Sequence, residues 1–344
     1  MSAKPLLEVE NLHTHYFTDE GVVKAVNGAS FSLAKGETLC LVGESGCGKS
    51  VTARSILQLI GVPGRIVSGS IRLHRDDGVV DIASLDARGK EMRAIRGARI
   101  SMIFQEPMSS LSPIHPIGEQ VAEVIRLHMR VEKEEAQERA VTMLRRVGIP
   151  QPETRLKSYP FEMSGGMRQR VMIAMALSCT PSLLIADEPT TALDVTTQAT
   201  ILDLIKDLQE ELGMAVLFIT HDLGVVAEIA DSVAVMYLGQ VVERAECDAI
   251  FHDPKHPYTQ ALLRSIPKLI VDGDRHLESI KGMVPHPFQR PSGCPFHPRC
   301  ERRLANVCAT LDPPQEWVGE RHGVSCLLYS DVEKLKQRQS AESV

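Results

Sequence analysis

An eight-residue loop, GESGCGKS at positions 43–50, follows the apolar run TLCLV and precedes a helical pattern, SVTARSILQLI. It fits the pattern G-x-x-x-x-G-K-[ST] in the strand-to-helix context that this pattern requires. Its glycines let successive backbone N–H groups converge on phosphate oxygens, and the positive end of the following helix adds to that attraction. Lys49 supplies a charge for the β- and γ-phosphates, and Ser50 supplies a hydroxyl for Mg²⁺. The loop therefore predicts a nucleoside triphosphate site with these candidate contacts: Gly43, Ser45, Gly46, Cys47, Gly48, Lys49, Ser50 and Val51.

Cys47 stands inside this loop, two residues before Lys49. A nearby lysine and a helix N-terminus both lower the pKa of a thiol, because they stabilise the thiolate. We therefore expect a lowered pKa for Cys47 and inhibition by alkylation. The alternative is a buried, inert thiol.

Composition sets broad limits on the class of protein. The chain has 344 residues, of which 43% are hydrophobic, and this length suits about two domains with a sizeable core. Its formal net charge of −6 argues against a surface built for bulk nucleic acid, so no nucleic-acid partner is expected. The start, MSAKPLLEVENLH, lacks the apolar segment of a secretory signal, and no run of about 18 apolar residues occurs. A soluble, cytosolic protein is expected, which can still dock on a membrane partner.

Short apolar runs alternate with helical patterns along the chain. The candidate strands are TLCLVG, ISMIF, LLIAD, AVLFIT and VAVMYLG, each too short for a helix. Residues 201–212 place five apolar side chains on one helical face: Ile201, Leu204, Ile205, Leu208 and Leu212. This alternation predicts an α/β fold with a mostly parallel sheet covered on both sides. Polar or glycine positions follow four of these strands, at the edge where such sheets bind ligands: Gly43, Gln105, Asp187 and His221.

Two acidic residues end the apolar run in SLLIADEPTTALD. Asp187 can reach the Mg²⁺ shell, directly or through water. Glu188 follows it, in the place to orient or deprotonate an attacking water. Acidic residues at a strand end can be mere surface charge, but beside a phosphate loop they indicate a hydrolytic site.

Between these motifs lies MSGGMRQR, which is similar to the signature L-S-G-G-Q of ATP-binding-cassette (ABC) ATPases. The resemblance implies a P-loop NTPase (RecA-like) fold, in which the signature of one subunit contacts the γ-phosphate held by the other. Ser164, Gly165 and Gly166 match the anion-contacting positions, at a predicted helix start. Two positions depart from the pattern: Met163 replaces leucine, and Met167 replaces glutamine.

Other positions match the same family one by one. Gln105 resembles the Q-loop glutamine, which senses Mg²⁺ and water. Asp194, in TALD, resembles the D-loop that crosses between subunits, and His221 resembles the switch histidine. Tyr16 resembles the aromatic residue that stacks on adenine, although core packing and the adjacent Phe17 are competing explanations. The resemblance thus implies Glu188, His221 and Gln105 as catalytic residues, and Ser50, Gln105 and Asp187 around Mg²⁺.

Changes of pattern and composition also predict a division of the chain. Residues 1–265 are expected to form the nucleotide-binding domain, with a strand-poor helical lobe inserted at about 106–178. After IPKLIVDGD, prolines, glycines, histidines and cysteines dominate, so residues 266–344 are expected to form a small Cys-rich extension.

Four longer segments are closely similar to ATP-binding subunits of the peptide/opine/nickel importer group: IFQEPMSSLSP, RQRVMIAMALSCTPSLLIADEPTTALDVTTQA, ITHDLGVVAEIAD and HPYTQALLRSIP. The resemblance implies uptake of di- or oligopeptides with two membrane permeases, an extracytoplasmic binding protein and a second, related ATPase subunit. The location implied is the cytoplasmic face of the inner membrane, peripherally bound. Opines, nickel chelates and oligosaccharides remain possible substrates, and a soluble ABC ATPase without a transport role remains the alternative class.

Four cysteines lie close together in the extension: Cys294, Cys300, Cys308 and Cys326. Four thiolates can bind a [4Fe–4S] cluster or a tetrahedral Zn²⁺, and these spacings fit neither common pattern. His297 is an additional candidate zinc ligand. The resemblance favours an iron–sulfur cluster, because related dipeptide-permease subunits carry one on such a tail, with zinc and free thiols as alternatives. The expected role is to stabilise a small, strand-poor extension.

Overall fold

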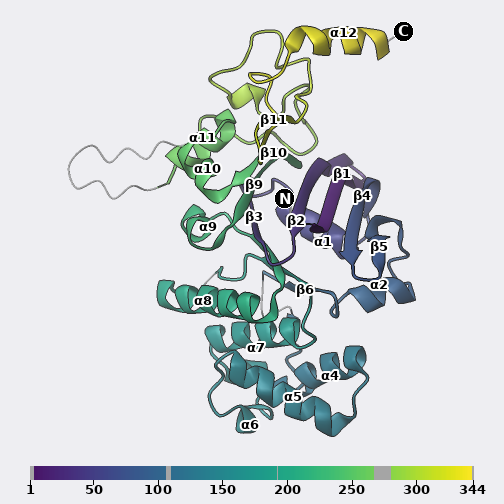
Figure 1. Ribbon diagram of the computed structural model, residues 1–344, viewed down its shortest axis with the longest axis vertical. Helices are drawn as coiled ribbons and strands as arrows, with labels where there is room; N and C mark the ends of the chain where they lie inside the picture. The colour runs from purple at the N-terminus through teal and green to yellow at the C-terminus, as the bar shows by residue number, and fades with distance from the viewer. Residues whose placement is uncertain (1–3, 106–109, 192, 267–279, 343–344) are drawn as a thin grey trace, which may run out of the picture. The chain divides into compact units, whose positions relative to one another are not determined.

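The computed structural model describes residues 4–105, 110–191, 193–266 and 280–342 (Figure 1). Part of the expected join, IPKLIVDGD, and the first residues of the expected helical lobe, 106–109, lie outside these ranges. The chain divides into two compact units. Unit 1 comprises Met1–Leu7, Leu33–Thr38 and Leu73–Ile219, and unit 2 comprises Glu8–Ser32, Leu39–Arg72 and Thr220–Val344.

Three buried parallel strands form the centre of unit 1: β6 (Ile100–Ile103), β7 (Leu183–Asp187) and β8 (Ala215–Ile219). β7 pairs in parallel with β6 on one side and with β8 on the other. Every residue of these strands is buried, which explains why each appears in the sequence as a continuous apolar run. The three strands predicted here are confirmed.

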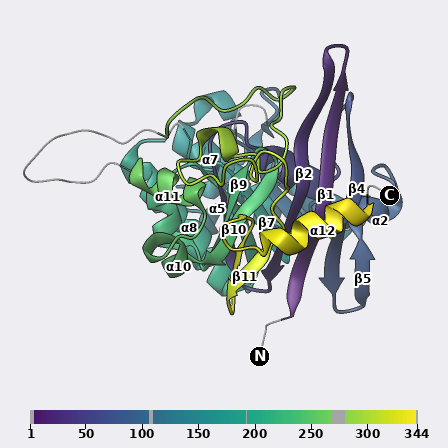
Figure 2. The same ribbon diagram turned by 90° about the horizontal axis from the view of Figure 1, so that it is seen from above.

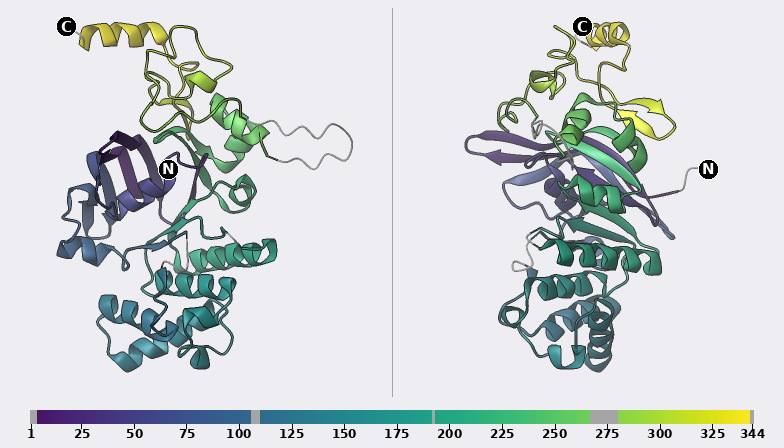
Figure 3. Two further views of the ribbon diagram at one scale, coloured as in Figure 1. Left: turned by 180° about the vertical axis from the view of Figure 1, so that it is seen from behind. Right: turned by 90° about the vertical axis from the view of Figure 1, so that its left-hand side faces the viewer.

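Helices fill the chain between β6 and β7: α4 (Ile117–Met129), α5 (Lys133–Arg146), α6 (Pro152–Arg155), the 3₁₀ turn η2 (Pro160–Glu162) and α7 (Gly165–Leu177). α4, α5 and α7 pack on one another, and α7 also contacts β6 (Figure 3). α4 and α5 are amphipathic, with Ile125, Ala140 and Leu144 fully buried. The described part of the expected helical lobe is therefore helical and contains no strand.

α8 (Val195–Leu212) is the long helix between β7 and β8. Ile201, Ile205 and Leu208 are buried as predicted, and Leu202 is buried with them. Leu204 and Leu212 are only half-buried, so the apolar stripe runs slightly to one side of the predicted face. Three short elements complete unit 1: β5 (Gly78–Asp81), η1 (Ile82–Ser84) and α2 (Lys90–Ile95).

Unit 2 contains a second run of paired strands. β3 (Thr38–Val42) pairs in parallel with β9 (Ser232–Tyr237), which pairs antiparallel with β10 (Gln240–Glu246). β12 (His322–Val324) and β11 (Glu316–Gly319) then add antiparallel to β10. β3 and β9 confirm the two remaining predicted strands, whereas the hairpin contributed by the Cys-rich extension was not predicted.

The helices of unit 2 lie mainly between or after these strands. They are α1 (Lys49–Ile56), α9 (Leu223–Ile229), α10 (Cys247–His252), α11 (Pro257–Arg264), η3 (His297–Arg299) and α12 (Val332–Glu342). α10 packs against α9, β9 and β10.

Three long strands, mostly within unit 2, lie side by side in the order β2-β1-β4 (Figure 2). They are β1 (Pro5–Thr18), β2 (Gly21–Ala34) and β4 (Gly64–Arg75). Their buried residues alternate with less buried, mostly polar ones, as Val26, Phe31 and Leu33 do in β2, which is typical of a sheet with one buried face. The sequence analysis did not predict these strands.

Candidate functional site

The phosphate loop connects β3 to α1 in unit 2, as predicted. Gly43 and Gly48 have φ values of 149° and 104°, in the region that favours glycine. A Cβ at Gly43 would collide with the Met236 carbonyl oxygen, and one at Gly48 would collide with that of Ala25. Both glycines are therefore required by close backbone packing as well as by conformation.

Lys49 is the charged residue of this loop, and its side chain is folded against the loop itself. Only 5% of the residue is exposed. The ammonium group donates to the carbonyl oxygens of Gly43 at 2.8 Å and Glu44 at 3.2 Å. Ser45 and Gly46 are exposed, and Ser50 and Val51 are half-buried. The loop thus combines a fixed cation with a tip that is accessible to a ligand.

The expected lowered pKa of Cys47 is wrong. Only 2% of this residue is exposed, and burial raises the pKa of its thiol. Lys49, whose Nζ lies 3.8 Å from the Cys47 sulfur, acts in the opposite direction but is outweighed. The alternative, a buried and protonated thiol, is the one that the structure supports.

Cys47 is therefore expected to react slowly with iodoacetamide at pH 7, because the thiolate is the reactive form and is disfavoured by burial. Mass spectrometry of the labelled protein measures this rate, and the same thiol in denaturant is the control. Labelling in the folded protein as fast as in denaturant would contradict the expectation.

The predicted catalytic carboxylate and the Q-loop glutamine meet in unit 1. The side-chain amide of Gln105 donates to Glu188 Oε2 at 2.9 Å. Asp187, at the end of β7, is 1% exposed. Glu188 has a φ of 48°, and its N–H donates to the Ile219 carbonyl oxygen at 2.9 Å. A left-handed backbone at a non-glycine residue is uncommon and concentrates at functional sites.

Thr191 is a member of this group that the sequence analysis missed. Its hydroxyl donates to the same Glu188 oxygen, at 3.0 Å. The Glu188 carboxylate is therefore held by two donors, Gln105, which precedes it in the sequence, and Thr191, which follows it. Thr191 is the first residue of TALD, so the motif itself was the available signal.

The signature turn begins a helix, as predicted. Ser164 is the N-cap of α7, and its hydroxyl accepts from the Met167 N–H at 3.3 Å. Ser164 and Gly165 are exposed, while Met163 is 5% exposed and packs inward as the usual leucine would. The turn presents its glycine and serine to solvent at a helix N-terminus, which is a favourable place for an anion.

Asp194 caps α8 in the same unit. It accepts from the Thr197 N–H at 2.9 Å and from the Thr197 hydroxyl at 2.8 Å. The backbone hydrogen bond from Thr197 lowers the pKa of this carboxyl. Gly166 lies close to Thr197, since a Cβ there would lie 3.0 Å from its methyl group. The predicted signature and D-loop residues are therefore neighbours.

His221 and Tyr16 lie in unit 2 with the phosphate loop. His221 is exposed and directly precedes Asp222, the N-cap of α9. Tyr16 is half-buried in β1 and lies beside Gly64. The Arg65 guanidinium lies 4.3 Å from the centre of the neighbouring Phe17 ring.

The predicted site residues thus fall into two groups. Unit 1 holds Gln105, Asp187, Glu188, Asp194 and the signature turn, and unit 2 holds the phosphate loop, Tyr16 and His221.

The four cysteines of the extension share one chemical environment. Each sulfur accepts a hydrogen bond from a backbone N–H, that of Phe296, Arg302, Leu304 or Leu328. Burial and the neighbouring cysteines raise the pKa of Cys294 to about 12 and that of Cys326 to about 11. Cys294, Cys308 and Cys326 are each 7% exposed, and Cys300 is half-buried. None of the four is in a disulfide.

Within the described ranges, no group of three or more His, Cys, Asp or Glu side chains is arranged to hold a metal ion. The helices of these ranges also include none that is long and apolar enough to cross a membrane.

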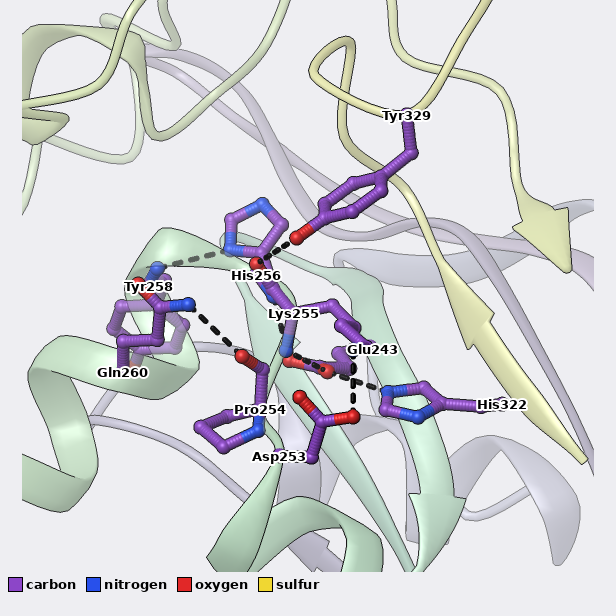
Figure 4. A network of polar contacts seen from close by, with 9 residues as sticks. All are labelled: Glu243, Asp253, Pro254, Lys255, His256, Tyr258, Gln260, His322 and Tyr329. Atoms are coloured by element: carbon purple, nitrogen blue, oxygen red, sulfur yellow. Dashed lines mark hydrogen bonds and ion pairs between the residues drawn. The ribbon is translucent and has the colours of Figure 1, made fainter. Parts of the chain in front are cut away.

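A buried polar network joins the extension to β10 (Figure 4). The fully buried carboxylate of Glu243 accepts from the N–H groups of Lys255 at 2.6 Å and His256 at 2.9 Å, and from His322 Nε2 at 2.7 Å. The ring of His256 accepts from the Tyr258 N–H at 3.0 Å, and burial lowers the pKa of His256 to about 3. The HPY motif therefore has a structural role at the start of α11.

Two protein-family models match the chain. Residues 26–191 match the family described as ABC transporter, and residues 242–308 match the one described as Oligopeptide/dipeptide transporter, C-terminal region. The second match contains the HPY segment and three of the four clustered cysteines.

Curated relatives cover nearly the whole chain. A putative peptide import ATP-binding protein of Brucella abortus is 49% identical, over 96% of this chain and 99% of the relative. The Bacillus subtilis oligopeptide transport ATP-binding protein AppD is 50% identical, over 95% and 97%, and the dipeptide transport ATP-binding protein DppD is 49% identical, over 94% of each chain.

Solved structures show the same fold. A dimeric bacterial ABC transporter cassette has a TM-score of 0.62 and 28% identity, covering 70% of this chain and 98% of that one. A dimeric post-hydrolysis state of an ATP-binding cassette bound to ADP and Pi has a TM-score of 0.61 at the same identity and coverage. The chain therefore belongs to the ABC transporter family, as an ATP-hydrolysing ATP-binding protein of the oligopeptide/dipeptide importer group.

Proposed function

We propose that this ATPase powers the uptake of di- and oligopeptides. The observation that carries the proposal is a sequence identity of 49–50% to relatives named for peptide import or peptide transport, over nearly the full length of both chains. The similarity extends into the extension, through the oligopeptide/dipeptide C-terminal region at 242–308. We take residues 1–265 as the nucleotide-binding domain and 266–344 as the extension.

Each site residue receives a role from its chemistry. The amides of the phosphate loop and Lys49 bind the triphosphate, and Tyr16 stacks on the base. Glu188, oriented by Gln105 and Thr191, accepts a proton from the attacking water, and His221 contacts the γ-phosphate. Ser164, Gly165 and Gly166 face the phosphate of a second subunit, and Asp194 lies at that interface.

Mg²⁺ fits the oxygen donors among these residues. The Asp187 carboxylate, the Gln105 amide oxygen and the Ser50 hydroxyl are hard ligands of the type that Mg²⁺ prefers, and Asp187 is almost completely buried. When bound, the ion neutralises charge on the β- and γ-phosphates.

The helical lobe provides a surface for membrane partners. A hollow of about 620 Å³ on unit 1 is lined by α4 and its neighbours, including His115, Glu119, Glu123, Leu127 and Lys133. Its mixed apolar and charged lining suits a short amphipathic segment. We propose that a membrane permease binds in this region, and that the complete transporter contains two permeases, a paralogous ATPase subunit and an extracytoplasmic binding protein. The protein would then lie peripherally at the cytoplasmic face of the inner membrane.

We propose that the four thiols hold a [4Fe–4S] cluster. Backbone N–H groups directed at all four sulfurs stabilise thiolates, and three of the residues are buried. A single zinc ion at about 2.3 Å from each sulfur would bring the sulfurs to about 3.8 Å from one another. Among the described residues the four thiols are not arranged around a metal ion, so the proposal rests on the residue type, since four Cys thiolates are the usual ligands of a [4Fe–4S] cluster.

Protein purified without oxygen is expected to be brown and to contain four irons and four sulfides per chain. Iron, sulfide and zinc analyses and the visible spectrum measure this. Cys308→Ser is expected to lose most of the iron, and Cys179→Ser, which changes a buried cysteine outside the cluster, is the matched control. A colourless protein with one zinc per chain would overturn the proposal in favour of zinc, and a protein with neither metal in favour of free thiols.

Purification from native membranes tests the transport role. The chain is expected to bring down two permeases and a related ATPase, and its loss is expected to stop uptake of labelled dipeptides. Uptake of an opine, a nickel chelate or an oligosaccharide instead would redirect the substrate assignment. Recovery with ribosomes or DNA, and without permeases, would contradict the transporter role.

A further inference from the structure

Glu44 is an unexpected residue in a loop shaped for phosphate. It directly follows Gly43, and its side chain carries a carboxylate, an anionic group like the ligand that the loop is proposed to bind. Like charges repel, and the repulsion grows where protein excludes water. A cation paired with the Glu44 carboxylate therefore reduces this repulsion and leaves the charge of Lys49 for the triphosphate.

Arg299 supplies that cation from the Cys-rich extension, 255 positions away in the sequence. Its guanidinium donates two hydrogen bonds to the Glu44 carboxylate, to Oε2 at 2.7 Å and to Oε1 at 3.0 Å. The Arg299 side chain is 4% exposed and that of Glu44 is 24% exposed. A bidentate pair of this kind fixes the direction of both side chains as well as neutralising the charge.

Arg299 is itself held in place. Its Nε donates to the Lys281 carbonyl oxygen at 3.1 Å, and its backbone N–H donates to that of Phe296 at 3.0 Å. It ends the short turn η3, between Cys294 and Cys300. The guanidinium is thus presented by a turn that lies between two of the clustered cysteines.

The backbone of Glu44 is bound by a second residue outside the loop. The Glu44 N–H donates to the hydroxyl of Tyr258 at 2.9 Å, and Tyr258 is fully buried. The Tyr258 ring packs on Tyr237 and Phe296, with ring centres 4.7 Å and 5.3 Å away. Phe296 belongs to the extension, so both contacts to Glu44 depend on the C-terminal part of the chain.

We propose that Arg299 is a positioning residue for ATP binding, which acts by neutralising and fixing Glu44 so that the phosphate loop can accept a triphosphate. The extension is then a part of the nucleotide site and not only an appendage to the cassette. The inference rests on the assignment of residues 43–50 as the phosphate loop.

A double-mutant cycle in the full-length protein tests the proposal, with a fluorescent ATP analogue and Mg²⁺ as the probe. Arg299→Ala is expected to raise its Kd about tenfold, through an unpaired carboxylate and a displaced loop. In a Glu44→Gln background there is no charge to neutralise, so adding Arg299→Ala is expected to raise the Kd by less than about threefold. Arg299→Lys, which keeps the charge but loses the bidentate geometry, is expected to lie between wild type and Arg299→Ala.

Lys281→Ala is the matched control, because it breaks the Lys281–Glu301 ion pair of the same extension without touching the loop. It is expected to leave the Kd unchanged, and circular dichroism establishes that each variant is folded.

An equal effect of Arg299→Ala in both backgrounds would overturn the proposal, because the residue would then act only through packing. If Arg299→Ala does not fold, a wild-type Kd for Arg299→Lys and Tyr258→Phe would overturn it. Absence of binding by the wild-type protein would instead contradict the phosphate-loop assignment.

Discussion

Replacing Glu188 with glutamine is expected to abolish ATP hydrolysis while leaving MgATP binding intact. Glutamine has nearly the same shape, and its amide oxygen can still accept from Gln105 and Thr191, as the carboxylate does at 2.9 and 3.0 Å. It cannot take a proton from water. Loss of a positioned general base lowers kcat by about 10²- to 10⁴-fold.

Steady-state hydrolysis and equilibrium nucleotide binding by the purified transporter complex separate these two effects. Glu210→Gln, which neutralises an exposed carboxylate on α8, is the matched control and is expected to keep wild-type turnover. Thr191→Val is expected to lower kcat by a smaller factor, because it removes one donor to Glu188 and keeps the base. Multiple turnover by Glu188→Gln at the wild-type rate would exclude Glu188 as the base.

The predictability of the fold depended on how each strand is buried. The five strands with continuous apolar runs were identified because both of their faces are covered. β1, β2 and β4 were not, because their buried residues alternate with polar ones and are interrupted by glycine and asparagine. Asn11, for example, has a φ of 45° within β1, which breaks the strict alternation that would have signalled a strand.

The candidate site shows a similar limit. Motif residues such as Lys49, Glu188 and Ser164 could be proposed from short patterns, since each pattern carries its own chemistry. Their partners could not, because the contact between Arg299 and Glu44 joins residues that are 255 positions apart. The pKa of Cys47 was misjudged for the same reason. Its neighbours in the sequence lower the pKa, but its burial, which only the folded chain determines, raises it.

A substitution in the signature turn is expected to have the second large effect on ATP hydrolysis, because the turn has room for a side chain that leaves the fold intact. Gly165 is exposed at the N-terminus of α7 and does not have a positive φ, and a Cβ added to it would meet no atom within 4 Å. A side chain there is therefore compatible with the fold. Gly166 differs, since a Cβ would press on Thr197 at 3.0 Å. Gly165 is thus the position where a change tests anion contact alone.

Gly165→Asp is expected to lower ATP hydrolysis by the assembled transporter by about 100-fold or more, because in the proposed dimer it places a negative charge against the γ-phosphate bound by the second subunit. Gly165→Ala adds bulk without charge and is expected to keep most of the activity. Binding of MgATP to the variant's own phosphate loop is expected to be unchanged, because in the proposed dimer the signature completes the site of the other subunit. Hydrolysis rates, single-subunit nucleotide affinity and ATP-dependent association of the two ATPase subunits measure the three consequences. Wild-type hydrolysis by both Gly165→Asp and Gly165→Ala would mean that no phosphate approaches this turn, and ATP could not then hold the two subunits together through Ser164 and its glycines.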